Sequence, residues 1–387
     1  MVARCFGLIC ALASEWALAA NSGDPVAIND ADTWRGAAIE RALQSTTAVT
    51  DPYRRAQVLA DVAKAQASDS EAAANHTLQA ALAAANQIAE PTFQGWALQE
   101  IALAQIAADD AIGARQTADR IRSERPQGAA FAAIALLQLR GGNLQAARNT
   151  VARITDSEAA GPVQRQIVMA QIGAGSLSAA RATALSIDEN FSQALALGDV
   201  AAVDVRTGNV AAANALAGAA RKAYRGQVYG RTALARVDAG DLNGALATLA
   251  KIDDPLDRAL LRARIGGQRA AAGDSAQAKQ LFADAVTGVQ QSRDRDHGKA
   301  LAWARLARVE FNAGELSGAR ECLRQAIAAV AAVPAGPQRN ETLDAIARTQ
   351  ARMGDSDAAL VTATEVNDRI IQALLIRDIV ASQPGID

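Results

Sequence analysis

The stretch GSLSAAR at residues 175–181 recurs, in varied spelling, along almost the whole chain. Each copy begins with a glycine, or with Asp or Ser in its place, and carries an alanine five residues later. We call the first residue of each copy its anchor. The anchors are Ser68, Asp109, Gly142, Gly175, Gly208, Gly240, Gly273, Gly314 and Gly354. They lie 32 or 33 residues apart in the middle of the chain and 40 or 41 apart towards its ends, a period typical of stacked repeats.

Fixed positions around each anchor predict a helical hairpin. Eight residues before it stand mostly apolar residues, such as Ile134 and Ile346, as on one face of a helix. Glycine at the anchor suits the left-handed conformation that ends a helix, and the next Asp, Asn or Ser can cap the following helix. The position five after the anchor is alanine in all nine copies, which lets two helices approach closely. These alanines are Ala73, Ala114, Ala147, Ala180, Ala213, Ala245, Ala278, Ala319 and Ala359.

Prolines and spacing predict where one hairpin gives way to the next. A proline can begin a helix but cannot continue one, so we expect Pro52, Pro91, Pro126, Pro162, Pro255 and Pro337 to lie between hairpins. We expect longer helices to absorb the steps of 40 and 41 residues, as in the run from Glu71 to Glu90.

One copy is similar to the tetratricopeptide repeat in the order of its aromatic, apolar and small residues. It comprises Trp303, Leu306, Ala307, Gly314, Ala319, Leu323 and Ala326. The resemblance covers roughly residues 33 to 380, although most aromatic positions of that family hold Ala, Gln or Arg here. It implies an all-α fold, a right-handed α-solenoid of about nine stacked hairpins. Helices near Trp34–Leu43 and Arg369–Ser382 are expected to cap the two ends.

Composition excludes some classes of function. Aromatic residues make up 3% of the 387, too few for a platform that stacks nucleic-acid bases. A net charge of −2 leaves no basic excess to neutralise phosphates, so no nucleic-acid partner is expected. The sequence contains no long uninterrupted apolar segment, so no transmembrane helix is expected. The composition shows no break, so we expect residues 21–387 to form one repeat domain.

The first twenty residues predict a secretory signal peptide. Arg4 precedes an apolar run from Cys5 to Leu12, and Ala17-Leu18-Ala19 has the form of a cleavage site. The alternative is that this segment forms a first amphipathic helix of the solenoid. Removal of residues 1–20 would leave Cys322 as the single cysteine, and the mature chain would be periplasmic or secreted from a bacterium.

No group of residues predicts catalysis, a metal site or a cofactor, so we expect no enzyme. The only histidines, His76 and His297, lack metal-ligand spacing, and His297 falls in a mixed-charge segment expected to be a loop between units. Residues 253–257 match the Asp-Asp-x-x-Asp pattern that binds magnesium diphosphate in some all-helical enzymes. The proline inside them favours a helix cap formed by Asp254 instead.

Partner binding is therefore expected on the concave face that the first helices line in the resembling family. The positions six and three residues before the anchor would face it. The candidate residues are Leu103, Ile106, Leu136, Leu139, Met169, Ile172, Leu234, Val237, Arg308, Phe311 and the pair Arg348 and Arg352. The apolar members would hold a helix or extended segment of a protein, unless tight packing closes the face. Arg348 and Arg352 could clamp a carboxylate, although Glu341 and Asp344 could pair with them instead.

The sequence thus predicts a protein-interaction scaffold of the bacterial envelope that binds a protein or peptide partner. Two other classes stay open. A self-assembling structural protein would expose residues such as Ile371, Leu374 and Leu375 on its final helix. An enzyme on an all-helical toroid would need a deep pocket with convergent carboxylates.

Overall fold

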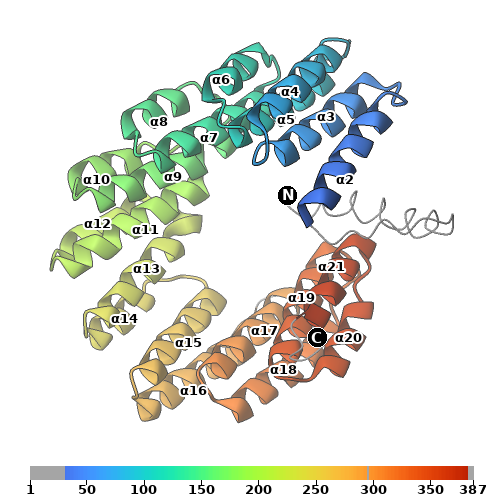
Figure 1. The fold of residues 1–387 in the computed structure, drawn as a ribbon. Coiled ribbons are helices and arrows are strands. Elements are labelled where there is room, and N and C mark those ends of the chain that lie inside the picture. The colour runs from blue at the N-terminus through green and yellow to red at the C-terminus, as the bar shows by residue number, and fades with distance from the viewer. Residues whose placement is uncertain (1–30, 294–295, 382–387) are drawn as a thin grey trace. The chain divides into compact units, whose positions relative to one another are not determined.

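The protein is all-helical throughout the part that the computed structural model describes, residues 31–293 and 296–381. The chain divides between Ser192 and Gln193 into two compact units, called unit 1 and unit 2 below. Within each unit, successive helices form hairpins that stack in chain order (Figure 1). The predicted signal peptide lies outside the described residues.

Unit 1 consists of helix α2 (Ala31–Thr46) followed by four hairpins. These pair α3 (Pro52–Gln66) with α4 (Glu71–Ala85), α5 (Pro91–Ala107) with α6 (Ala111–Arg120), α7 (Glu124–Arg140) with α8 (Leu144–Val151), and α9 (Ser157–Gly173) with α10 (Leu177–Leu185). The first helices contact one another in order, α3 with α5, α5 with α7 and α7 with α9. Each hairpin therefore buries its apolar face against the next one.

Unit 2 contains five further hairpins and a final helix. They pair α11 (Asn190–Arg206, which contains the division) with α12 (Val210–Ala219), α13 (Arg225–Asp238) with α14 (Leu242–Leu249), α15 (Pro255–Ala271) with α16 (Ser275–Gln291), α17 (Asp296–Asn312) with α18 (Leu316–Val330), and α19 (Pro337–Arg352) with α20 (Ser356–Thr364). A short 3₁₀ helix η1 (Lys222–Tyr224) precedes α13, and α21 (Arg369–Ala381) packs on α19 and α20. The nine hairpins of the described residues, flanked by α2 and α21, confirm the predicted tetratricopeptide-like fold.

From the second hairpin onward, the turn inside each hairpin has the predicted backbone conformation. The anchor glycines from Gly142 to Gly354 have φ angles of 72° to 84°, and Asp109 adopts 60°. The backbone N–H after the anchor donates to the carbonyl five residues earlier, as from Ser176 to Gln171 at 2.8 Å, which closes the first helix. The next helix is capped by a side chain such as Asp241, which accepts from the Gly244 N–H at 2.8 Å. Ser176 and Glu315 occupy the cap position without such a bond.

The first hairpin departs from the predicted register by one residue. Its turn is one residue longer, so Ser70 caps α4 and not Asp69, the residue after the anchor. As a result Ala74 is fully buried at the helix contact, whereas Ala73 is half-buried. The turn here carries no glycine, and the alignment on Ser68 was wrong by that one position.

Alanine marks the place where the two helices of a hairpin meet. From Ala114 to Ala359, the eight alanines five residues after an anchor are all 0% exposed. A larger side chain there would push the helices apart, at a cost of about 1–3 kcal/mol.

The longer steps are absorbed as expected, because α4, α16 and α18 have 15 to 17 residues while the other second helices have 8 to 10. Four of the six prolines, Pro52, Pro91, Pro255 and Pro337, begin helices as predicted. The other two lie inside a helix, Pro126 in the first turn of α7 and Pro162 further along α9, contrary to the prediction.

Two glycines of one hairpin allow a test of the left-handed conformation of the turn. Gly208 has a φ of 82°, where an alanine is strained, so Gly208→Ala should lower the free energy of unfolding by about 1 kcal/mol. Gly218 lies in α12 with nothing within 4 Å of an added Cβ, so Gly218→Ala should be neutral or stabilising by up to about 1 kcal/mol. Urea unfolding of both variants measures the difference, and equal midpoints would contradict the assignment of the turn.

Candidate partner-binding surface

The position six residues before the anchor carries exposed apolar side chains on two consecutive first helices. Leu136 on α7 is 37% exposed and Met169 on α9 is 41% exposed. Leu103 and Leu234, at the same position of other hairpins, are half-buried. Arg308 and Arg348 occupy it later in unit 2 and are exposed. The predicted face is therefore open at these residues.

The position three residues before the anchor belongs more to the core than predicted. Ile106 and Leu139 pack against buried clusters of unit 1, and Val237 is only 8% exposed inside a cluster of unit 2. Ile172 and Phe311 are half-buried. These side chains point towards the neighbouring hairpin, so the accessible strip is narrower than the sequence suggested. In unit 1 it is centred on Leu136 and Met169.

The predicted pair Arg348 and Arg352 is not a free clamp. The guanidinium of Arg348 lies 3.0 Å from Asp344, one turn away on α19, and 3.0 Å from Asp378 on α21. The intramolecular alternative therefore holds for Arg348 and Asp344, whereas Glu341 pairs with Arg305 at 3.2 Å. Arg352 is exposed and has no ion pair within the described residues.

Ion pairs between successive first helices also lie on these helices, and spacing alone did not reveal them. Lys64 on α3 meets Glu100 on α5 at 2.9 Å, and Arg231 on α13 pairs with Asp199 on α11. Such pairs, about one repeat apart in sequence, hold neighbouring hairpins in register. Both pairs are partly buried, with Lys64 and Glu100 each 26% exposed, so solvent screens them less than it screens an exposed ion pair.

A column of polar side chains lies inside the hairpins, four residues before each anchor. It comprises Gln105, Gln138, Gln171, Asp204, Arg236, Arg269, Glu310 and Gln350. Five of these are 5% exposed or less. Some contact the second helix through a threonine eight after the anchor, as Thr362 donates to Gln350 at 2.7 Å. Others contact the cap, as Arg269 does at 2.8 Å from Asp274. This column was not predicted, although every copy from Gln105 onward is polar.

Glu310 is the buried acid of that column and is 2% exposed. It faces Cys322 on α18, which is 1% exposed, and a side chain at Gly318 would collide with it. One carboxylate oxygen, Oε2, is buried without a hydrogen-bond partner. Burial raises the pKa of Glu310 from 4.5 to about 7, the hydrogen bond with Cys322 opposes the rise, and the charge of Glu315 adds to it. Burial also raises the pKa of the Cys322 thiol, which therefore stays protonated.

The remaining residues that were considered for metal binding or catalysis have structural roles. Asp254 caps α15 by accepting from the Asp257 N–H at 2.8 Å, as predicted. His297 lies in the first turn of α17 and not in a loop, with Nδ1 3.4 Å from the Thr342 hydroxyl. Among the described residues, no group of three or more His, Cys, Asp or Glu side chains is arranged to hold a metal ion. None of the described helices combines the length and apolarity needed to cross a membrane.

Comparisons with known proteins found similar solved structures, all at low TM-scores. No model of a protein family matches it, and no curated protein matches either. Among solved structures it is similar to Ton1535 from Thermococcus onnurineus NA1, with 17% identity over 99% of both chains and a TM-score of 0.32. It is also similar to a circular tandem repeat protein, with 12% identity over 90% of this chain and 88% of that one, at a TM-score of 0.17.

A third similar structure is that of the APC/C hetero-tetramer Cut9-Hcn1. It shares 10% identity over 91% of this chain and 97% of that one, with a TM-score of 0.20. All three TM-scores are low, so the fold assignment rests on the hairpins themselves.

Glu310 predicts a pH dependence of stability. Its pKa is higher in the folded chain, at about 7, than the 4.5 of an exposed glutamate. The folded state therefore holds the proton more tightly, and stability should fall as pH rises from about 4.5 to 7. Glu310→Gln removes this slope and should stabilise the chain at pH 8 by on the order of 2 kcal/mol.

Urea unfolding at pH 5 and pH 8 measures the effect, with Glu321→Gln as the control. Glu321 is exposed on α18, the helix that faces Glu310 of α17, and hydrogen bonds from Arg324 and Gln325 lower its pKa. Its replacement should leave the slope of the wild type unchanged. A Glu310→Gln variant with the same pH slope as the wild type would show that Glu310 does not titrate as described.

Proposed function

We propose that the chain is a protein-interaction scaffold whose first helices in unit 1 bind a segment of a partner protein. The observation that carries the proposal is the exposure of Leu136 and Met169 at the same position of consecutive hairpins. On the same two helices, α7 and α9, the large apolar side chains Phe131, Ile134 and Ile167 are at most 2% exposed.

The surroundings of the two side chains suit an apolar ligand. Helices α7 and α9 are in direct contact, so Leu136 and Met169 form neighbouring points of one strip. Leu139 and Ile172, half-buried beside them, widen its apolar part. Contiguous exposed apolar residues mark interaction sites more often than isolated ones do. Methionine adds a flexible side chain that adapts to different partner shapes.

A helix or an extended segment fits a strip of this kind. An amphipathic helix offers apolar side chains at every third or fourth residue, which can meet one hairpin after another. The self-assembling alternative has its own supporting observation on α21, where Ile370 is 74% and Ile371 is 40% exposed. Leu374 on that helix is half-buried, whereas Leu375 is fully buried and takes no part in such a surface.

Site-specific photo-crosslinking tests the proposal. A benzophenone amino acid replaces Leu136, and the chain is expressed in its native host and irradiated. We expect a crosslinked product with a different polypeptide. Adding Met169→Asp should reduce its yield by roughly tenfold, because burying a methionine contributes about 1.5–3 kcal/mol.

The matched control is Ile112→Asp. Ile112 is 74% exposed on α6, a second helix, and so lies off the proposed surface. Its replacement should leave the yield of crosslinked product unchanged. A product that contains only two copies of this chain would favour the self-assembling alternative, and an absence of any product would contradict the proposal.

We also propose that the scaffold acts in the bacterial envelope after export. The support is the sequence of residues 1–20, with Arg4, the apolar run and the Ala17-Leu18-Ala19 site. Mass spectrometry of the chain purified from the periplasmic fraction should give a mature N-terminus near residue 20. A chain that retains residues 1–20 and stays with the cytoplasmic fraction would contradict this location.

A further inference from the structure

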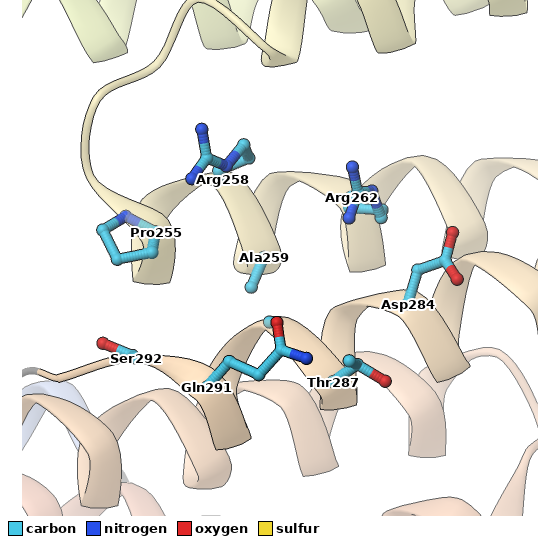
Figure 2. Close-up of a pocket in the computed structure, with 9 residues that line it drawn as sticks. Pro255, Arg258, Ala259, Arg262, Asp284, Thr287, Gln291 and Ser292 are labelled. Carbon is cyan, nitrogen blue, oxygen red and sulfur yellow. The ribbon is translucent and has the colours of Figure 1, made fainter.

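A cavity of about 420 Å³ lies between α15 and α16, entirely within unit 2 (Figure 2). Its residues come from the first half of α15, the second half of α16 and Ser292, which directly follows α16. Two small residues, Ala259 and Gly288, meet at its base, where a Cβ at residue 288 would lie 3.1 Å from that of Ala259. Volumes of this size suit a small molecule.

The cavity lies along the far half of a long second helix. Helix α14 has 8 residues and spans about 12 Å, whereas α16 has 17 and spans about 25 Å. The two helices start at equivalent turns, after Asp241 and Asp274, so the second half of α16 extends beyond the length of α14. The α16 residues of the cavity belong to that extension, since they begin only at Asp284.

Two arginines on successive turns of α15 supply the charge. Figure 2 shows Arg258 and Arg262 on one side of the helix. Arg258 donates from Nη1 to the carbonyl of Ile252 at 3.0 Å. This bond fixes the guanidinium and leaves its other N–H groups available to donate to a ligand. Arg262 makes no hydrogen bond or ion pair with the described residues, and its Nε is buried without a partner. An unpaired buried donor on a cation is costly and calls for an acceptor.

The rest of the lining leaves a net positive site rich in donors. Asp284 is the one carboxylate among the nine lining residues, and it accepts from Gln280 at 3.0 Å. Gln291, exposed on the same helix, has an amide that makes no hydrogen bond within the described residues. Two guanidinium groups and an amide together can donate to several oxygen atoms of one anion.

We propose that this cavity binds a small molecule through a carboxylate or phosphate group held between Arg258 and Arg262. Both groups present paired oxygen atoms to a guanidinium fork, so the shared chemistry is an oxyanion. The residues of this cavity belong to unit 2, whereas Leu136 and Met169 belong to unit 1.

Calorimetric titration of the purified chain with succinate and, separately, with inorganic phosphate tests the site. We expect saturable binding of one molecule per chain with a Kd below about 1 mM for at least one of them. Preference for succinate identifies a carboxylate ligand, and preference for phosphate identifies a phosphorylated one. Failure of both to saturate would overturn the proposal.

Two pairs of variants locate the binding. Arg262→Gln should weaken it at least tenfold, whereas Arg264→Gln, exposed on the same helix outside the cavity, should not. Gln291→Glu adds a second carboxylate to the cavity and should also weaken binding, whereas Gln290→Glu, the exposed neighbour outside the lining, should not. Equal losses within either pair would show that the anion binds elsewhere.

Discussion

The structure depends on the close approach of two helices at an alanine five residues after each turn. Alanine is 0% exposed at this position in eight consecutive hairpins, from Ala114 to Ala359. The turn before it makes the approach possible, because a left-handed residue closes the first helix and an Asp, Asn or Ser begins the second. Since one hairpin cannot bury its outer apolar side alone, stacking follows from the same constraint.

Second-helix length is the variable that this constraint leaves free. The inner alanine contact lies in the first half of the second helix, so residues can be added at its far end without disturbing the turn. Helices α4, α16 and α18 are lengthened in this way. Where a long second helix follows a short one, as α16 follows α14, its far half extends past the length of the shorter helix. The longer sequence step before Gly314 adds that far half of α16, and the same residues line the cavity beside Arg262.

The sequence predicted the hairpins, their caps and the two flanking helices because each depends on residues close together in the chain. It failed where tertiary contacts decide. Pro162 lies inside α9, where neighbouring hairpins hold the helix despite a missing backbone donor. Val237 was expected on the accessible face but packs into the core, because helix periodicity gives an angle around the axis and not the distance to the next hairpin. The cavity required both helix lengths and could not be inferred from either alone.

The buried polar column shows why a polar residue in an aligned repeat need not lie in solvent. Gln105, Arg236 and Glu310 each point at a glycine four residues after the anchor, which leaves room for them between the helices. Gln350 instead bonds a threonine, Thr362, on the facing helix. Several members of the column keep a buried polar atom that has no hydrogen-bond partner within the described residues, among them Gln105, Arg236 and Glu310. The contacts that the column does make, such as that with Thr362, form only when the two helices meet in one register, so they favour that register over a slipped one. Alanine permits the close contact, and the polar column determines which residues make it.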